Sequence, residues 1–194
     1  MEPLQIGFAL CSSFCTFATA IKEMASLAQN GASLLPIMSE TAYQTNTRFG
    51  AAEEINATIE RICQNPILYT IPQAEPIGPK GLLDILVVAP CTGNTLAKLA
   101  GGITDNTVTM ACKSHLRNNR PVVIAISTND GLSANLQNIG KLLARKQFYF
   151  VPFGQDNPSG KPNSLVADLS KLAPTIEKAM LGEQLEPILT GGGS

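Results

Sequence analysis

The sequence predicts a single α/β domain in which a doubly wound parallel sheet lies between two helical layers. Short apolar runs alternate with amphipathic segments of about 10–15 residues, a pattern typical of β–α–β units with right-handed crossovers. Of the 194 residues, 44% are hydrophobic and 15% are charged. This composition excludes a generally disordered chain, and the length fits one domain.

The expected strands are short runs of apolar and β-branched residues. Residues 4–10 carry few polar side chains, as expected for a strand buried on both faces of a sheet. Residues 84–89 have the strongest strand character. The other strands are expected at residues 33–38, 67–71, 121–126 and 148–153.

Helices are expected where apolar residues recur at helical spacing. The first, residues 16–29, ends at Asn30-Gly31, where glycine permits a left-handed conformation. The others are expected at residues 49–64, 94–100, 105–118, 133–146 and 165–180. Residues 72–81 contain three prolines and two glycines and are expected to form a loop, and residues 155–164 a turn-rich connection. We expect one domain over residues 1–189 and a flexible tail over residues 190–194, TGGGS.

Charge and hydropathy exclude several classes of protein. The formal net charge is -1, without the basic stripe of a nucleic-acid binder. No apolar run approaches the roughly 20 residues that a membrane span needs. The first apolar run lacks the basic segment and cleavage site of a signal peptide, so a cytoplasmic protein is expected. The low charge favours a homo-oligomer with apolar interfaces, although a large buried sheet also raises apolar content.

The five cysteines are expected to be free thiols, because their number is odd and no secretion signal is evident. Cys112 and His115 are three residues apart on an expected helix and could chelate a metal together. No second chelating pair follows, so we expect no metal site and interpret these residues as packed side chains.

The candidate ligand site lies in the loops that follow the strands. In an open parallel sheet, ligands bind at the carboxyl ends of the strands. Four of these loops are rich in hydroxyl and amide groups, which suits an anion held at helix N-termini. They comprise residues 11–16, 39–41, 90–95 and 127–131. Helix capping alone explains the same residue types, and no GxGxxG or GxxxxGK[ST] motif is present.

One segment resembles a known family. Residues 89–100, APCTGNTLAKLA, and residues 102–106, GITDN, resemble the PASANTxxKxAxGIxDN signature of the flavoprotein family, which includes phosphopantothenoylcysteine decarboxylase and the peptidyl-cysteine decarboxylases. The resemblance covers roughly residues 4–150. It implies a three-layer, Rossmann-like flavoprotein fold that binds FMN.

The resemblance also implies site residues. Cys11-Ser12-Ser13 stands where the family has the T-G-S turn that holds the FMN phosphate, and Asn129 stands in the substrate motif P-A-M-N. The implied FMN-binding residues are Ser12, Ser13, Thr16, Ser39, Pro90, Cys91, Thr92, Gly93, Asn94, Thr95 and Asp105.

Departures from the family pattern argue against cysteine decarboxylation. The decarboxylases use a histidine from the region after the second strand as a base, and residues 39–71 contain none. The only histidine, His115, lies on a later helix, where we expect it to be packed. The proline and methionine of P-A-M-N are Ile126 and Thr128 here. No residue stands out as a general base, so catalytic residues stay unassigned.

Other segments resemble one branch of this family, whose members serve in the synthesis of pyridine-2,6-dicarboxylate (dipicolinate) in spore-forming bacteria. The segments are IGFALCSSFCTF, residues 89–132 and FVPFGQDNP. This resemblance implies a separate partner chain that binds NADP, a trimer or dodecamer, and oxidation of a dihydrodipicolinate-type precursor in the mother-cell cytoplasm. Lys98, Lys113 and Arg117 are candidate contacts for the dicarboxylate. Two alternatives remain: a non-catalytic activator of that partner with a vestigial flavin site, and a flavin-storage protein or prenyl-flavin-type transferase.

Overall fold

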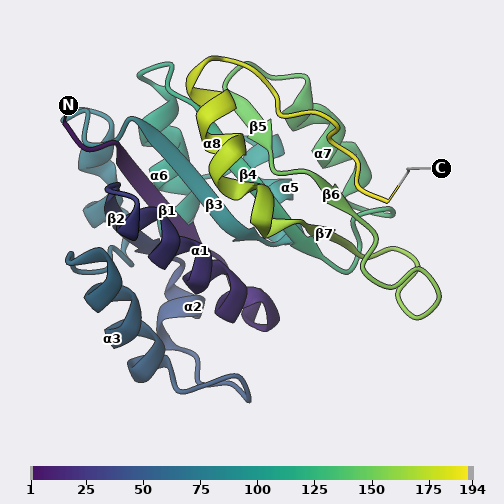
Figure 1. The fold of residues 1–194 in the computed structure, drawn as a ribbon, viewed down its shortest axis with the longest axis horizontal. Coiled ribbons are helices and arrows are strands. Elements are labelled where there is room, and N and C mark those ends of the chain that lie inside the picture. Colours follow the sequence, from purple (N-terminus) through teal and green to yellow (C-terminus); the bar gives the residue numbers. More distant parts are fainter. Residues whose placement is uncertain (1, 192–194) are drawn as a thin grey trace.

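Parallel strands form the centre of the protein in the computed structural model, which describes residues 2–191 (Figure 1). Their order across the sheet is β2-β1-β3-β4-β5. They are β1 (Gln5–Leu10), β2 (Ser33–Met38), β3 (Ile85–Cys91), β4 (Val122–Thr128) and β5 (Phe148–Phe150). Every residue of β3 is buried, which explains why the sequence shows apolar runs here rather than strict alternation.

Two short antiparallel strands complete a seven-stranded sheet. They are β6 (Phe153–Gly154) and β7 (Leu165–Ala167), and β7 pairs with the carboxyl end of β4. The expected single strand over residues 148–153 is therefore divided, and the helix expected at residue 165 begins later. A 3-10 turn, η3 (Leu169–Lys171), leads into α8 (Leu172–Met180). A three-residue apolar run has no periodicity that distinguishes a strand from a helix, which accounts for the error.

Helices cover both faces of the sheet. In Figure 1, α1 (Phe17–Gln29) and α8 lie over one face, and the other is covered by α5 (Gly93–Gly101), α6 (Thr107–Leu116) and α7 (Leu136–Leu143). The helix α3 (Ala52–Cys63) packs beside α1 and β2. In α1 the buried residues recur at spacings of three and four, as in an amphipathic helix: Phe17, Ala20, Met24 and Leu27.

The segment between α3 and β3 differs from the sequence prediction. The expected strand at residues 67–71 is reduced to one parallel bridge between Ile37 and Leu68. The expected loop contains α4 (Ile71–Ala74) and a 3-10 turn, η2 (Glu75–Ile77). Proline is tolerated in the first turn of a helix, where its missing N–H would have no partner, so Pro72, the second residue of α4, does not prevent this helix.

The regions after β2 and near the C-terminus hold smaller differences from the prediction. A short helix that was not predicted, α2 (Glu40–Gln44), follows β2 directly. Near the C-terminus, the Thr190 N–H donates to the Phe153 carbonyl at 2.9 Å. Residues 192–194 of the expected flexible tail lie outside the described residues. Among residues 2–191, no helix combines the length and apolar character that crossing a membrane requires.

Candidate functional site

The carboxyl ends of β1, β3 and β4 meet at one edge of the sheet. The Cys11 N–H donates to the Pro90 carbonyl at 3.2 Å, which joins the ends of β1 and β3. The Ser13 and Ser127 hydroxyl oxygens are 2.8 Å apart and join the first loop to the end of β4. Strand order reverses beside β1, because β2 lies on one side of it and β3 on the other. Open α/β sheets bind ligands beside such a reversal, and we call this edge of the sheet, with the loops 11–16, 90–95 and 127–131, the crevice.

The predicted site residues differ in their accessibility. Those exposed are Ser12, Asn94, Asp105 and Asn129. Those half-buried are Ser13, Thr16, Ser39 and Thr92. Those buried are Pro90, Cys91, Gly93 and Thr95.

The first helical segment begins without a side-chain cap. Neither Ser13, before the 3-10 turn η1 (Phe14–Thr16), nor Thr16, before α1, accepts a capping hydrogen bond from the backbone. The Thr16 hydroxyl instead donates to the Ser13 carbonyl at 2.8 Å. Backbone N–H groups at an uncapped helix start can bind an anion, and the exposed Ser12 hydroxyl lies beside them.

Two other predicted site residues cap helices. The Thr92 hydroxyl accepts from the Thr95 N–H at 3.3 Å, and the Ser39 hydroxyl accepts from the Ala42 N–H at 3.2 Å. These hydroxyls therefore satisfy the starts of α5 and α2. Asn94, in the first turn of α5, is exposed and has a side-chain amide that can reach a ligand.

Buried thiols lie beneath the crevice. The Thr95 hydroxyl donates to the Cys11 sulfur at 3.2 Å. Hydrogen bonds from Cys91 and Thr95 lower the pKa of Cys11, whereas burial raises the pKa of Cys91 and of Cys112 well above the ordinary thiol value. All five cysteines are free, as predicted. Among the described residues, no cluster of side chains could hold a metal ion.

A carboxylate network that the sequence analysis missed surrounds Gly93. Asp130 accepts hydrogen bonds from the Thr128 hydroxyl at 2.6 Å and from the Asn135 amide at 2.9 Å. These hydrogen bonds, that from Thr128 first, lower the pKa of Asp130 and keep it ionised. A Cβ at Gly93 would lie 2.4 Å from Asn135 Nδ2 and 2.6 Å from both Asp130 Oδ1 and Thr128 Oγ1, so any other residue requires this network to shift. The signal in the sequence was the spacing Thr-x-Asp, which favours a local side-chain hydrogen bond.

Asp105 is occupied by an ion pair. The Lys98 ammonium contacts both of its carboxylate oxygens, at 2.8 and 2.9 Å. The hydrogen bond from Lys98 lowers the pKa of Asp105. The charge of Lys98 is thus already matched, which weakens its candidacy as a dicarboxylate contact.

The other two candidate cations lie at the opposite edge of the sheet. At the start of α6, the Thr107 hydroxyl donates to the side chain of Glu40, the first residue of α2. This end of α6 therefore lies near the carboxyl ends of the strands. At its end, the His115 ring hydrogen-bonds the Pro121 carbonyl at 3.0 Å, directly before β4 starts. Lys113 and Arg117 belong to this end of α6. The structure therefore does not bring them to the crevice.

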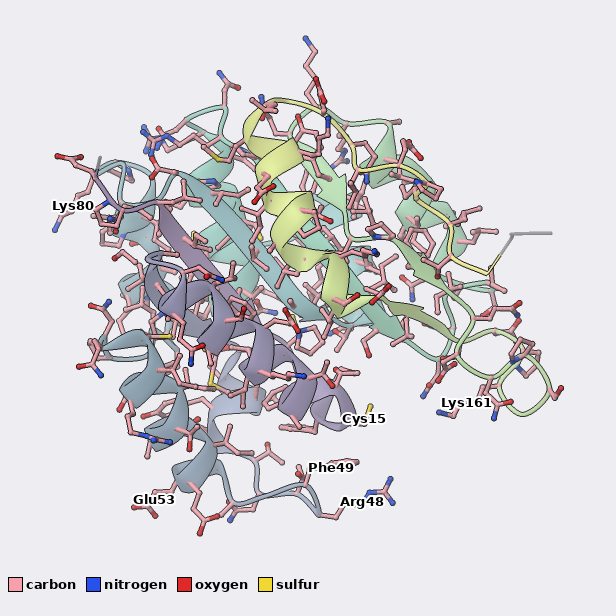
Figure 2. All side chains as sticks on the ribbon, in the orientation of Figure 1. Cys15, Arg48, Phe49, Glu53, Lys80 and Lys161 are labelled. Carbon is pink, nitrogen blue, oxygen red and sulfur yellow. The ribbon has the colours of Figure 1, made fainter. Side chains whose placement is uncertain are left out.

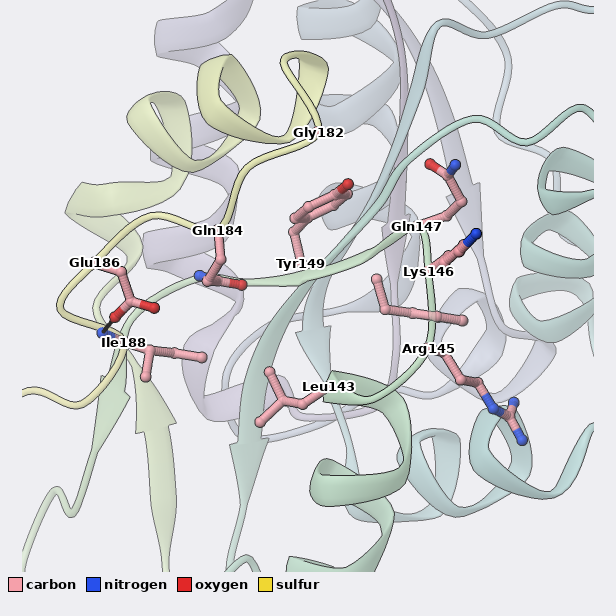
Figure 3. A pocket seen from close by; sticks show the side chains of 10 residues that line it. Leu143, Arg145, Lys146, Gln147, Tyr149, Gly182, Gln184, Glu186 and Ile188 are labelled. Atoms are coloured by element: carbon pink, nitrogen blue, oxygen red, sulfur yellow. Dashed lines mark hydrogen bonds between the residues drawn. The ribbon is translucent and has the colours of Figure 1, made fainter.

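A second hollow lies away from the crevice, between the end of α7, β5 and the C-terminal segment (Figure 3). Two of its polar side chains, Arg145 and Gln184, have structural partners. Arg145 donates to the Leu99 and Ala100 carbonyls at the end of α5, at 3.0 and 2.7 Å. Gln184 forms hydrogen bonds with both backbone groups of Phe150, at 2.8 and 2.7 Å. These two side chains therefore serve contacts within the fold.

Comparison with known sequences identifies relatives over nearly the whole chain. The sequence model of the family described as Flavoprotein matches residues 1–172. The B subunit of dipicolinate synthase from Bacillus subtilis (strain 168) is 46% identical over 185 residues, covering 95% of this chain and 92% of that protein.

Solved structures agree with this result. The crystal structure of the dipicolinate synthase B subunit from Bacillus halodurans C superimposes with a TM-score of 0.89 at 45% identity, covering 97% of this chain and 98% of that chain. The crystal structure of the FMN-dependent cysteine decarboxylase SpaF gives a TM-score of 0.67 at 19% identity, covering 93% of this chain and 97% of that chain. At that identity the second match concerns the fold alone. The predicted doubly wound α/β fold is confirmed.

Proposed function

The chain belongs to the flavoprotein family, and we propose that it is a component of dipicolinate synthase that binds FMN in the crevice at the carboxyl ends of β1 and β3. The observation that carries the proposal is the crevice itself. It combines a reversal of strand order with an uncapped helix start and a turn of glycine and hydroxyl residues. Its relatives from dipicolinate synthase give the proposal its reaction.

The residues present fit a flavin nucleotide. The uncapped N–H groups near Ser12 and Ser13 suit a phosphate, because they carry partial positive charge and lack side-chain partners. Gly93 allows the turn before α5 to pack closely on Thr128, Asp130 and Asn135, which brings the loops after β3 and β4 together at this edge. The proposed FMN contacts are Ser12, Ser13, Thr16, Ser39, Pro90, Cys91, Thr92, Gly93, Asn94, Thr95 and Asp105.

When bound, FMN supplies a hydride acceptor for oxidation of a dihydrodipicolinate-type ring to an aromatic pyridine. The chain's own residues bind and orient. Asn129, exposed in the turn after β4, offers an amide to the substrate. Asp130 stays ionised and fixes the shape of this turn through hydrogen bonds from Thr128 and Asn135, beside Gly93 at the start of α5.

The proposal includes partners. The A subunit of dipicolinate synthase, binding NADP, is the proposed partner in the mother-cell cytoplasm, and copies of this chain are proposed to form a trimer or dodecamer. The relatives are named as B subunits, which supports a second, different component in the enzyme. Exposed apolar side chains support further contacts: Leu136 and Ile103 are each 51% exposed.

A second candidate function is a non-catalytic activator of the NADP-binding partner. One observation favours it: among the described residues, the crevice presents no histidine, and Asp130 is engaged in structural hydrogen bonds. In this case the pocket is vestigial, and the partner carries out the oxidation.

The visible absorbance of the purified protein tests the proposal, measured before and after addition of FMN and desalting. We expect retained flavin bands. A colourless protein that releases all added FMN would contradict the flavin site and favour the activator. Assays of the chain with and without its NADP-binding partner then separate a catalyst from an activator.

A further inference from the structure

One cationic turn projects from the same end of the molecule as the crevice. Residues 45–51 follow α2, which begins directly after the carboxyl end of β2. Figure 2 shows the labelled Arg48 and Phe49 projecting at the end where Cys15 also lies, opposite the end that carries Lys80. Within residues 2–191, no acidic side chain forms an ion pair with Arg48.

The turn is held in one conformation by its own backbone. Thr47 and Gly50 each donate an N–H to the carbonyl of the other at 3.1 Å, which leaves Arg48 and Phe49 at the tip. Gly50 has a φ of 149°, a value that favours glycine. The Asn46 side chain accepts from the Ala52 N–H at 2.8 Å and ties the turn to the start of α3.

The two tip residues contact each other through their side chains. The Arg48 guanidinium lies over the Phe49 ring, 4.8 Å from its centroid, and Phe49 remains 48% exposed. A guanidinium offers a planar fork for a carboxylate, and an aromatic ring offers a face for stacking. A flat ring that carries carboxylates matches both groups together.

We propose that the Arg48–Phe49 turn binds the cyclic dicarboxylate of the reaction, with the guanidinium on a carboxylate and the Phe49 ring against the ligand ring. This inference rests on the proposed function. It assigns to Arg48 the role that the sequence analysis gave to Lys98, Lys113 and Arg117. The ion pair of Lys98 weakens its candidacy, and the position of Lys113 and Arg117 at the end of α6 removes those two from that role.

Calorimetric titration of the FMN-treated protein with pyridine-2,6-dicarboxylate measures the affinity for this ligand and tests the inference. We expect R48Q to weaken binding at least tenfold, and R48K to weaken it less, because lysine keeps the charge but loses the fork. F49L is expected to weaken binding as well. Lys80→Gln, which removes an exposed cation at the opposite end, is the matched control and should bind like wild type. The affinity for pyridine-2-carboxylate should differ less between wild type and R48Q than the affinity for the dicarboxylate does.

The outcomes separate this inference from the proposed function. Equal affinity of wild type and R48Q would overturn the inference, as would loss of FMN retention in R48Q, which would assign the turn to the cofactor. Retention of FMN without dicarboxylate binding by the wild type would overturn the inference and leave the flavin site standing. Binding of neither ligand would defeat both. Unchanged thermal unfolding of R48Q and F49L shows that the variants fold.

Discussion

Gly93 is the residue at which packing and the candidate site coincide. Alanine there would force Asn135, Asp130 and Thr128 to move, because its Cβ would lie 2.4 Å from the amide nitrogen of Asn135 and 2.6 Å from an oxygen of each of the other two. We expect G93A to lower the free energy of unfolding by about 1–3 kcal/mol, measured by urea denaturation. Gly140→Ala is the matched control. No atom lies within 4 Å of its new Cβ, so that helix should gain about 0.4–1 kcal/mol. A stability of G93A equal to wild type would mean that the network yields easily.

His115 contributes a pH dependence that belongs to stability and not to catalysis. It is 1% exposed, and burial lowers its pKa from 6.5 to about 4. The folded state favours the neutral form of His115. The contribution of this residue to the free energy of unfolding is therefore complete above the unfolded pKa and is lost as the pH falls toward the folded pKa. Between about pH 6.5 and pH 4 the loss should be on the order of 3 kcal/mol. In H115Q, whose amide can still donate to the Pro121 carbonyl, denaturation curves should lose this part of the pH slope. A slope identical to wild type would assign it to other groups.

At the scale of elements, the sequence predicts the long, periodic segments well and the short ones poorly. The strand at residues 33–38 matches β2 in both bounds, because apolar residues and a glycine stop delimit it. Residues 67–71 contain the same residue types but make only one bridge, since the chain turns into α4 at Thr70. The division of the expected strand 148–153 into β5 and β6 follows from pairing, because β5 pairs with β4 and β6 with β7, and no local pattern encodes these contacts.

The candidate site shows the same division. Loops 11–16, 90–95 and 127–131 could be placed together from the sequence, because parallel strands present their carboxyl ends at one edge. The sequence could not show which hydroxyl groups serve as helix caps. Thr92 and Ser39 cap helices, whereas the Ser13 hydroxyl contacts Ser127 instead. Helical spacing predicts on which face of a helix a residue lies, but not how far along the sheet it lies. For that reason Lys113 was a candidate that the structure places elsewhere.

At the scale of the whole molecule, the low charge and the exposed apolar side chains point to self-association. Only 15% of residues are charged, against about 25% in an average domain. Leu136 and Leu143 lie seven residues apart on α7 and are 51% and 41% exposed. Apolar side chains of this size are removed from water when copies associate, and that burial stabilises an oligomer.

We expect light scattering of the purified protein at micromolar concentration to give a multiple of the 20.5 kDa chain mass. Leu136→Asp should lower this mass if α7 lies in the interface, with Leu82→Asp, in a loop elsewhere and 40% exposed, as the matched control. A 20.5 kDa monomer would contradict the homo-oligomer and leave the proposed partner subunit to cover these apolar residues.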